Sequence, residues 1–118
     1  MDPTEIVDAM QAAYRDRDLE RFLAVCAPDV EVRDAKGELL MDRSGMRDFY
    51  ERLFRNSPEL TLEIRNRIAV GDVVVEEEEV RGSHLSGFPE RVHAAVAIHL
   101  TDTKVARIVF LSVVDLDA

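Results

Sequence analysis

The sequence predicts an α+β fold, with helices in the first half of the chain and a mostly antiparallel sheet in the second half. Apolar residues recur every three or four positions up to about Asn56, which is typical of helices. From Leu60 onward they alternate with period two, which is typical of strands. Helices that are separate in sequence from antiparallel strands define the α+β class. The length of 118 residues fits one domain, 1–118.

Two helices open the chain. Asp2 is a suitable N-cap and Pro3 a suitable first residue for a helix with one apolar face, formed by Ile6, Val7, Met10, Ala13 and Tyr14. Asp18 caps a second helix that ends before Pro28 and whose apolar side holds Leu19, Phe22, Leu23 and Cys26. We therefore expect Cys26 as a buried thiol on a helix.

A short hairpin and a third helix follow. Residues 29–34, DVEVRD, alternate as a strand, and the turn AKGE leads to a short second strand at 39–41. Asp42 or Ser44 caps a helix that runs to about Asn56, with an apolar side of Met46, Phe49, Tyr50, Leu53 and Phe54. Pro58 ends this helix because a residue that precedes proline disfavours the helical conformation.

Two long hairpins complete the predicted sheet. Residues 60–70, LTLEIRNRIAV, alternate strictly, so Leu60, Leu62, Ile64, Ile68 and Val70 share one face. The turn 71–72 is glycine followed by aspartate, which suits a two-residue type II′ hairpin that pairs Val70 with Val73. The strand 73–82 follows, and a loop at 83–90 leads to strands at 91–100 and 105–116.

Four glutamates, 76–79, follow three valines in the strand 73–82. The hairpin register places Arg67 opposite Glu76 and Arg65 opposite Glu78 on one face. These pairs of opposite charge explain Glu76 and Glu78 as surface residues, because each exposed pair contributes about 0.2–1 kcal/mol.

Glu77 and Glu79 lack such an explanation, because the same register puts them with Asn66 on the apolar face. In one interpretation the end of the sheet projects past the core, and both carboxylates lie in water. In the other they line a pocket, where burial raises a carboxyl pKa and makes acid–base chemistry accessible. Asp34 also has two interpretations: it starts the turn that follows it, or it points into the pocket.

The charge and composition argue against several classes of partner. A net charge of −9 argues against nucleic acid and against an anionic membrane, since both require clustered Lys and Arg. No apolar run approaches the ~18 residues of a membrane span, and the acidic N-terminus is unlike a signal peptide, so we expect a cytoplasmic protein. One cysteine and three histidines without ligand spacing predict no disulfide, no metal site and no cofactor.

The order and spacing of these elements resemble the nuclear transport factor 2-like superfamily, which includes ketosteroid (steroid delta) isomerases, SnoaL-like polyketide cyclases and limonene epoxide hydrolase-type enzymes. The segments that carry the resemblance span nearly the whole chain: YRDRDLERFLAVCAPDVEVRD, SGMRDFYERLF, IAVGDVVVEEEEVRG and KVARIVFLSV. The resemblance implies a conical half-barrel, in which a strongly curved sheet wraps around three helices and an apolar pocket opens at one end. It also implies a homodimer through the outer face of the sheet.

The resemblance suggests site residues as well. Members similar to ketosteroid isomerase carry a general base in a V-x-D-x-x-G segment, which VRDAKG matches with Asp34. Their oxyanion-hole donors correspond to Met10 and Val96 here, and Tyr14 lies one helical turn beyond Met10. GSHLSG resembles a G-T-H-x-G segment of the polyketide cyclases, which suggests His84 at the pocket mouth; the alternative is a solvated loop histidine.

Three functional hypotheses follow. The first is proton transfer on an apolar carbonyl substrate, with Asp34 as base and Glu77 or His84 as acid. The second is a non-catalytic pocket that holds a small apolar, hydroxylated or cationic molecule, and the third is a dimerisation module with a filled pocket. For a bound ligand, we expect contacts with Tyr14, Tyr50, Asn66, Glu79 and Val96.

Overall fold

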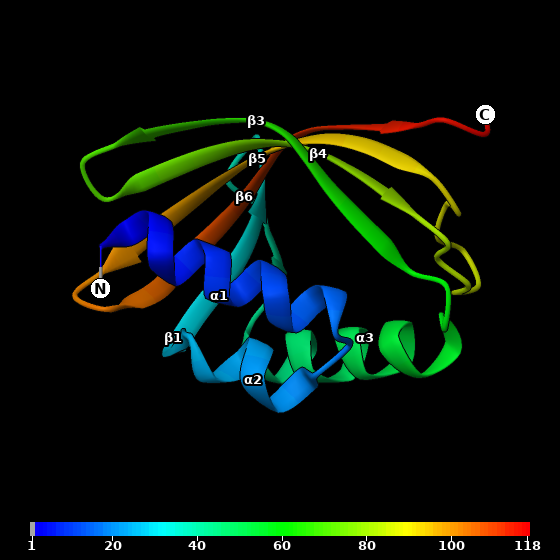
Figure 1. Cartoon of the computed structure of the whole chain (residues 1–118), viewed down its shortest axis with the longest axis horizontal. Helices are drawn as coiled ribbons and strands as arrows, with labels where there is room; N and C mark the ends of the chain where they lie inside the picture. The colour runs from blue at the N-terminus through cyan, green and yellow to red at the C-terminus, as the bar shows by residue number, and fades with distance from the viewer. Residues whose placement is uncertain (1) are drawn as a thin grey trace.

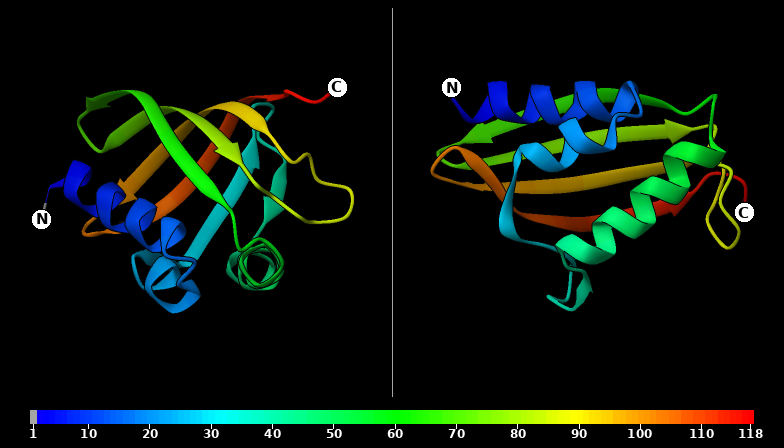
Figure 2. Two further views of the ribbon diagram at one scale, coloured as in Figure 1. Left: turned by 45° about the vertical axis from the view of Figure 1, so that its right-hand side comes forward. Right: turned by 90° about the horizontal axis from the view of Figure 1, so that it is seen from below.

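The computed structural model describes residues 2–118 and shows three helices packed on one face of a curved six-stranded sheet (Figure 1). The strands follow the order β2-β1-β6-β5-β4-β3. Their bounds are β1 (Cys26–Asp34), β2 (Leu39–Met41), β3 (Thr61–Val70), β4 (Val73–Arg81), β5 (Val92–Thr101) and β6 (Lys104–Asp115). Among these strands of residues 2–118, only the β1–β6 pair is parallel. The sheet curves around the helices without closing (Figure 2), which confirms the predicted α+β half-barrel.

Each helix begins at an aspartate cap. The side chain of Asp2 accepts a hydrogen bond from the backbone N–H of Glu5 (2.9 Å) before α1 (Pro3–Arg15). Asp18 caps α2 (Leu19–Ala24), and Asp42 rather than Ser44 caps α3 (Arg43–Asn56). These carboxylates satisfy N–H groups that have no partner within the helix, and they confirm the predicted helix starts.

The structure corrects the position of Cys26. The thiol is buried as predicted, but α2 ends at Ala24, and Cys26 is the first residue of β1. It pairs there with Val105 of β6, whose N–H donates to the carbonyl of Val25 (2.8 Å). This hydrogen bond across the parallel pair takes the place of a further helical turn.

The predicted hairpin register holds only near its turn. Val70 pairs with Val73 across a turn in which Gly71 has a φ of +56°, a value that glycine adopts without strain. A bulge at Arg65 then shifts the register of β3 against β4. Because one extra residue reverses the alternation of a strand, Ile68 and Val70 are 63% and 70% exposed on the outer face. The prediction that they share a face with buried Leu62 is therefore wrong.

The predicted faces of β4 are reversed as well. Glu76 and Glu78 are 0% and 9% exposed and point toward the helices together with Val74, whereas Glu77 points to the outer face. Three consecutive valines place an apolar side chain on both faces, so they do not decide which face is inside. The prediction of the inward face rests on the alternation of β3, which the bulge interrupts.

The core lies between the helices and the concave face of the sheet (Figure 2). Its fully buried members come from all layers and include Leu23, Met46, Leu53, Val74 and Ile98. An aromatic group of Tyr14, Phe22, Tyr50 and Phe54 packs where the three helices meet. Within residues 2–118, no helix is both long enough and apolar enough to cross a membrane.

Candidate functional site

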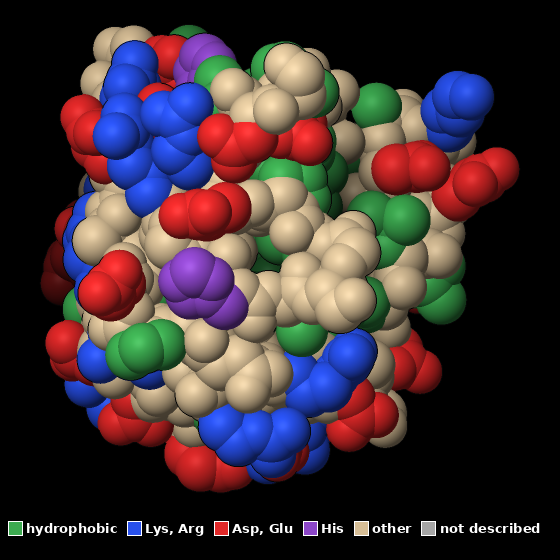
Figure 3. Space-filling model, turned by 90° about the vertical axis from the view of Figure 1, so that its right-hand side faces the viewer, with side chains coloured by type: hydrophobic (Ala, Val, Ile, Leu, Met, Phe, Trp, Pro, Cys, Tyr) green, Lys and Arg blue, Asp and Glu red, His purple; other side chains and the backbone are tan. Residues whose placement is uncertain are grey.

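A cavity of about 690 Å³ lies between the helices and the concave face of the sheet. This volume is within the range of small-molecule sites, ~300–1,000 Å³. Its wall is mainly apolar and includes Met10, Phe22, Phe49, Val96, Ile98 and Phe110. Figure 3 faces the end of the molecule at the right of Figure 1 and shows hydrophobic side chains inside a hollow with acidic side chains nearby. The arrangement favours a ligand that is mostly apolar.

Four of the residues predicted for the site border this cavity: Tyr14, Asp34, Tyr50 and Val96. The rings of Tyr14 and Tyr50 meet edge to face with centroids 6.2 Å apart. Burial raises the pKa of both hydroxyls, and nearby Glu78 raises both further. Neither hydroxyl hydrogen-bonds to another group in residues 2–118, so both can donate to a ligand.

Asp34 ends β1 at the edge of the cavity and combines its two predicted roles. Its Oδ1 accepts hydrogen bonds from the backbone N–H groups of Lys36 (2.9 Å) and Glu38 (3.0 Å), so it starts the turn. The same side chain lines the cavity. Oδ2 accepts no hydrogen bond from residues 2–118 and is the oxygen that can take a proton from a ligand.

Glu77 and Asn66 do not reach the cavity. Glu77 accepts hydrogen bonds from Asn66 Nδ2 (2.6 Å) on one oxygen and from His93 Nε2 (2.6 Å) on the other, on the outer face of the sheet. The hydrogen bond from Asn66, followed by that from His93, lowers the pKa of Glu77. Of the two interpretations of Glu77, the one that places it in a pocket with a raised pKa is therefore wrong, because its partners favour the ionised form.

Glu79 and His84 also lie outside the cavity. Glu79 forms ion pairs with Arg81 (2.6 Å) and Arg65 (3.1 Å), and the hydrogen bond from Arg81 is the main cause that lowers its pKa. His84 is exposed in the loop between β4 and β5, where its backbone N–H donates to Ser57 Oγ (2.9 Å). The predicted contacts of Glu79 and His84 with a ligand thus have no support in the cavity geometry.

The sequence-based prediction missed one carboxyl group that lines the cavity, that of Glu78 on β4. Burial is the main cause that raises the pKa of Glu78 to about 8, and the negative charge of Glu76 adds to it. The hydrogen bond from Gln11 and the positive charge of Arg15 act in the opposite direction. At neutral pH this carboxyl group therefore holds its proton and can donate a hydrogen bond.

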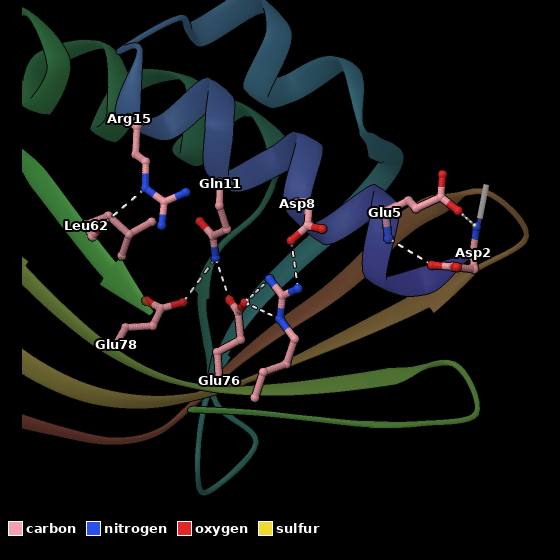
Figure 4. A network of polar contacts seen from close by, with 9 residues as sticks. Asp2, Glu5, Asp8, Gln11, Arg15, Leu62, Glu76 and Glu78 are labelled. Atoms are coloured by element: carbon pink, nitrogen blue, oxygen red, sulfur yellow. Dashed lines mark hydrogen bonds and ion pairs between the residues drawn. The ribbon is translucent and has the colours of Figure 1, made fainter. Parts of the chain in front are cut away.

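Gln11 connects α1 to both inward glutamates (Figure 4). Its Nε2 donates to Glu76 Oε1 (2.6 Å) and to Glu78 Oε2 (3.2 Å), and all three side chains are buried. The sequence did contain a signal for this contact, because Gln11 stands in the apolar stripe of α1, four residues after Val7. A buried amide needs polar partners, and Glu76 and Glu78 are the partners it has.

The cavity thus combines proton donors with proton acceptors in an apolar surrounding. Glu78, Tyr14 and Tyr50 can donate hydrogen bonds to an oxygen atom of a ligand, and Asp34 can accept a proton from it. Together these groups fit acid–base chemistry. Among residues 2–118, no three His, Cys, Asp or Glu side chains are grouped to hold a metal ion.

Comparison with known proteins identifies relatives of this fold. The model of a SnoaL-like domain matches residues 7–108. Among solved structures, an uncharacterised cystatin-fold protein from Novosphingobium aromaticivorans is 24% identical, with a TM-score of 0.84 over 95% of this chain and 99% of that chain. Among curated proteins, no sequence matches.

Two further solved structures contain small molecules. TerC, co-crystallised with polyporic acid, is 24% identical, with a TM-score of 0.73 over 92% of this chain and 89% of its own. A hypothetical protein from Catenulispora acidiphila with a ketosteroid isomerase-like fold, in complex with trimethylamine, is 22% identical. Its TM-score is 0.70 over 92% of this chain and 85% of its own. At these identities the likeness concerns the fold.

Proposed function

Because this chain belongs to the SnoaL-like domain family, within the nuclear transport factor 2-like superfamily, we propose that its cavity binds a small, largely apolar molecule and catalyses proton transfer beside a carbonyl group of that molecule. The observation that carries the proposal is the position of Glu78, whose carboxyl group is buried in the cavity wall beside Glu76, where burial raises its pKa. Strongly perturbed carboxyl groups in clefts are typical of acid–base sites. Glu78 thereby takes the role of acid that was predicted for Glu77 or His84.

In this proposal, Asp34 is the base. Its Oδ2 takes a proton from the carbon next to the carbonyl group, while Glu78 and the two tyrosine hydroxyls donate hydrogen bonds to the carbonyl oxygen. These hydrogen bonds stabilise the negative charge that develops on that oxygen. The proton then returns from Asp34 to a carbon of the ligand, so no other reactant is needed. One positioned base contributes ~10²–10⁴-fold to the rate of such a transfer.

The solved neighbours support a small-molecule ligand in this fold. TerC is described with polyporic acid and the Catenulispora protein with trimethylamine. These molecules belong to those proteins. They support the proposal that the cavity of this fold binds a small molecule. They do not identify the ligand of this chain.

Proton transfer can be tested without the natural substrate. An apolar cyclic ketone, 2-tetralone, is incubated with the protein in D₂O, and deuterium uptake at the carbons next to the carbonyl is followed by NMR. We expect uptake to be faster than in buffer alone, and Asp34→Asn to lower the enzyme-dependent rate by ~10²–10⁴-fold. Asp48→Asn, an exposed carboxylate on α3, is the matched control and should exchange deuterium like the wild type.

Either of two results would contradict the proposed catalysis: deuterium uptake no faster than in buffer across a panel of apolar ketones, or an Asp34→Asn variant as active as the wild type. Retained activity in Glu78→Leu would remove Glu78 from the site. Each variant is first checked by circular dichroism, so that a loss of activity is not a loss of fold.

A non-catalytic binding protein is the second candidate function. It is favoured by the two backbone hydrogen bonds that occupy Oδ1 of Asp34 and give this residue a structural role in its turn. In this case, small apolar molecules should raise the melting temperature, since ligands that bind only the folded state stabilise it. Stabilisation by ketones without any deuterium uptake would select this candidate over catalysis.

Homodimerisation through the outer face of the sheet is part of the proposal. Ile68, Val70 and Val114 are exposed apolar side chains on the strands of this sheet. A second copy of the chain that covers this face would remove these side chains from water, which is favourable. Sedimentation velocity should give about twice the mass of 13.4 kDa, and Val70→Asp should shift the species toward the monomer. A monomeric wild type at concentrations near 100 μM would contradict the dimer.

A further inference from the structure

The two inward glutamates of β4 lie closer to each other than their charges favour. Glu76 and Glu78 are two residues apart on the same face of the strand, both are buried, and one amide group, Nε2 of Gln11, donates to both carboxyl groups (Figure 4). Two neighbouring carboxylates in a poorly solvated site do not both ionise readily. Such a pair titrates as a unit rather than as two independent groups.

The surroundings of the two glutamates are unequal. Oε2 of Glu76 accepts a hydrogen bond from Nε of Arg67 (2.9 Å) and a second one from the same guanidinium. Nη1 of Arg67 in turn donates to Asp8 (2.7 Å), which is exposed on α1. Glu78 has no ion pair among residues 2–118 and borders the apolar cavity instead. The positive charge is therefore placed to stabilise the carboxylate of Glu76.

Four titratable groups face Glu78 from the elements around it: Glu76 on β4, Tyr14 and Arg15 on α1, and Tyr50 on α3. On β3 and β5, the residues that pair with Glu78 are not titratable. The tyrosine hydroxyls are neutral at physiological pH. The Nε of Arg15 donates to the carbonyl of Leu62 (3.1 Å), and no hydrogen bond joins Arg15 to Glu78. Glu76 is thus the charged group in most direct contact with Glu78.

We propose that Glu76 and Glu78 hold one proton between them, and that Glu76, fixed by Arg67 and Gln11, is a positioning residue that keeps this proton on Glu78. The hydrogen bond from Gln11 occupies Oε2 of Glu78, whereas no donor among residues 2–118 reaches Oε1. The proton therefore belongs on Oε1. The proposal deepens the proposed function, because it explains how the cavity keeps an acid neutral at physiological pH. Its catalytic part rests on the proposed function, whereas the shared proton does not.

NMR of the glutamate side-chain carboxyl carbons, recorded on the ligand-free protein from pH 5 to pH 10, tests this proposal. In the wild type we expect a carboxyl group with a high midpoint, and we expect it to be that of Glu78. Glu76→Gln should lower the midpoint of Glu78 by at least one pH unit, a tenfold loss of proton affinity. Glu77→Gln is the matched control: it removes the same charge from the next residue of β4, but on the opposite face, and should leave the midpoint within ~0.3 pH unit because the two groups lack contact.

A second variant has the opposite expected sign. Arg67→Gln removes the cation from Glu76, so the proton affinity of the pair should rise and a second glutamate should begin to titrate above its ordinary range. An unchanged midpoint of Glu78 in the Glu76→Gln variant overturns the positioning role of Glu76. If neither variant folds, the wild-type titration decides alone, and a high midpoint on Glu76, on both residues or on neither overturns the proposal.

The outcome is separable from that of the proposed function. The titration uses no ligand, so a protein that fails to bind or deuterate any ketone can still show one proton on Glu78. Conversely, a positive exchange assay together with an ordinary midpoint for Glu78 would keep proton transfer by Asp34 and reject the role of Glu76.

Discussion

Replacement of Glu78 by glutamine should change how the stability of the protein depends on pH. The pKa of Glu78 is about 8 in the folded chain, against 4.5 for an ordinary glutamate. Between these two values the folded state binds a proton that the unfolded state has released. Stability therefore falls as the pH rises through this interval, and each pH unit removes up to about 1.4 kcal/mol from the free energy of unfolding.

The difference between pH 5.5 and pH 7.5 gives the clearest measurement. Over these two pH units, the linkage relation predicts that Glu78 removes about 2–3 kcal/mol from the free energy of unfolding. Glu78→Gln cannot titrate, so its free energy of unfolding should lack this loss. Urea unfolding, followed by circular dichroism at both pH values, measures the difference between the variant and the wild type.

The choice of interval separates Glu78 from other titrating groups. Glu20, Glu31, Glu77 and Glu79 have lowered pKa values, so their stabilising effect is lost only as the pH falls below about 5. Contributions from groups that the variant and the wild type share cancel in the difference. Glu20→Gln, which removes an exposed glutamate paired with Arg47, is the control and should follow the wild type across the interval. Parallel curves for Glu78→Gln and the wild type would refute a buried, protonated Glu78.

Three further predictions concern the rest of the fold. Gly82→Ala should lower the free energy of unfolding by about 2–4 kcal/mol, because the φ of Gly82 is +81° and a Cβ would lie 2.4 Å from the carbonyl oxygen of Glu59. Gly87→Ala is the control: Gly87 has a φ of +79° but open space around it, so this variant should lose only about 1 kcal/mol. Equal losses in the two variants would contradict the close approach at Gly82. Asp42→Ala should cost about 1 kcal/mol in urea unfolding, since it removes the cap of α3, and an unchanged midpoint would argue against this cap. Burial raises the pKa of the Cys26 thiol to about 11. A thiol reagent at pH 8 should therefore label the folded chain about 100-fold more slowly than the urea-unfolded chain. Equal labelling rates would show that the thiol is accessible.

Local signals made the helices and the first part of the long hairpin predictable. An aspartate cap acts over three residues, and Asp2, Asp18 and Asp42 stand where the structure begins its helices. The glycine of the 71–72 turn fixes the pairing of its immediate neighbours, and the pairing holds as far as Asn66 and Glu77. These contacts depend on residues that are close in sequence, which is why one sequence suffices to identify them.

The direction of the glutamates depends on contacts that are distant in sequence. The bulge at Arg65 has no signature in the strict alternation of residues 60–70, yet it decides which residues of β3 face the core. The packing of α1 against β4 then selects the even-numbered glutamates, through a contact between Gln11 and Glu76 that spans 65 positions. The resemblance to a family suggested Asp34, Tyr14 and Val96, and these residues border the cavity together with Tyr50, which was also predicted as a ligand contact. The roles of these residues, the single domain and the cytoplasmic location stay predictions.

The burial of Glu78 is easier to explain by chemistry than by stability. Glu76 has a structural explanation, since it forms an ion pair with Arg67 that links β4 to β3 and, through Asp8, to α1. Glu78 has no such partner among residues 2–118, and above pH 5 its carboxyl group lowers the stability of the fold. An apolar residue of similar volume would fit the aromatic wall without this loss. A group that weakens the fold and faces a cavity with two free tyrosine hydroxyls is typical of a functional site, and this combination favours Glu78, rather than the outward Glu77, as the acid of the proposed reaction.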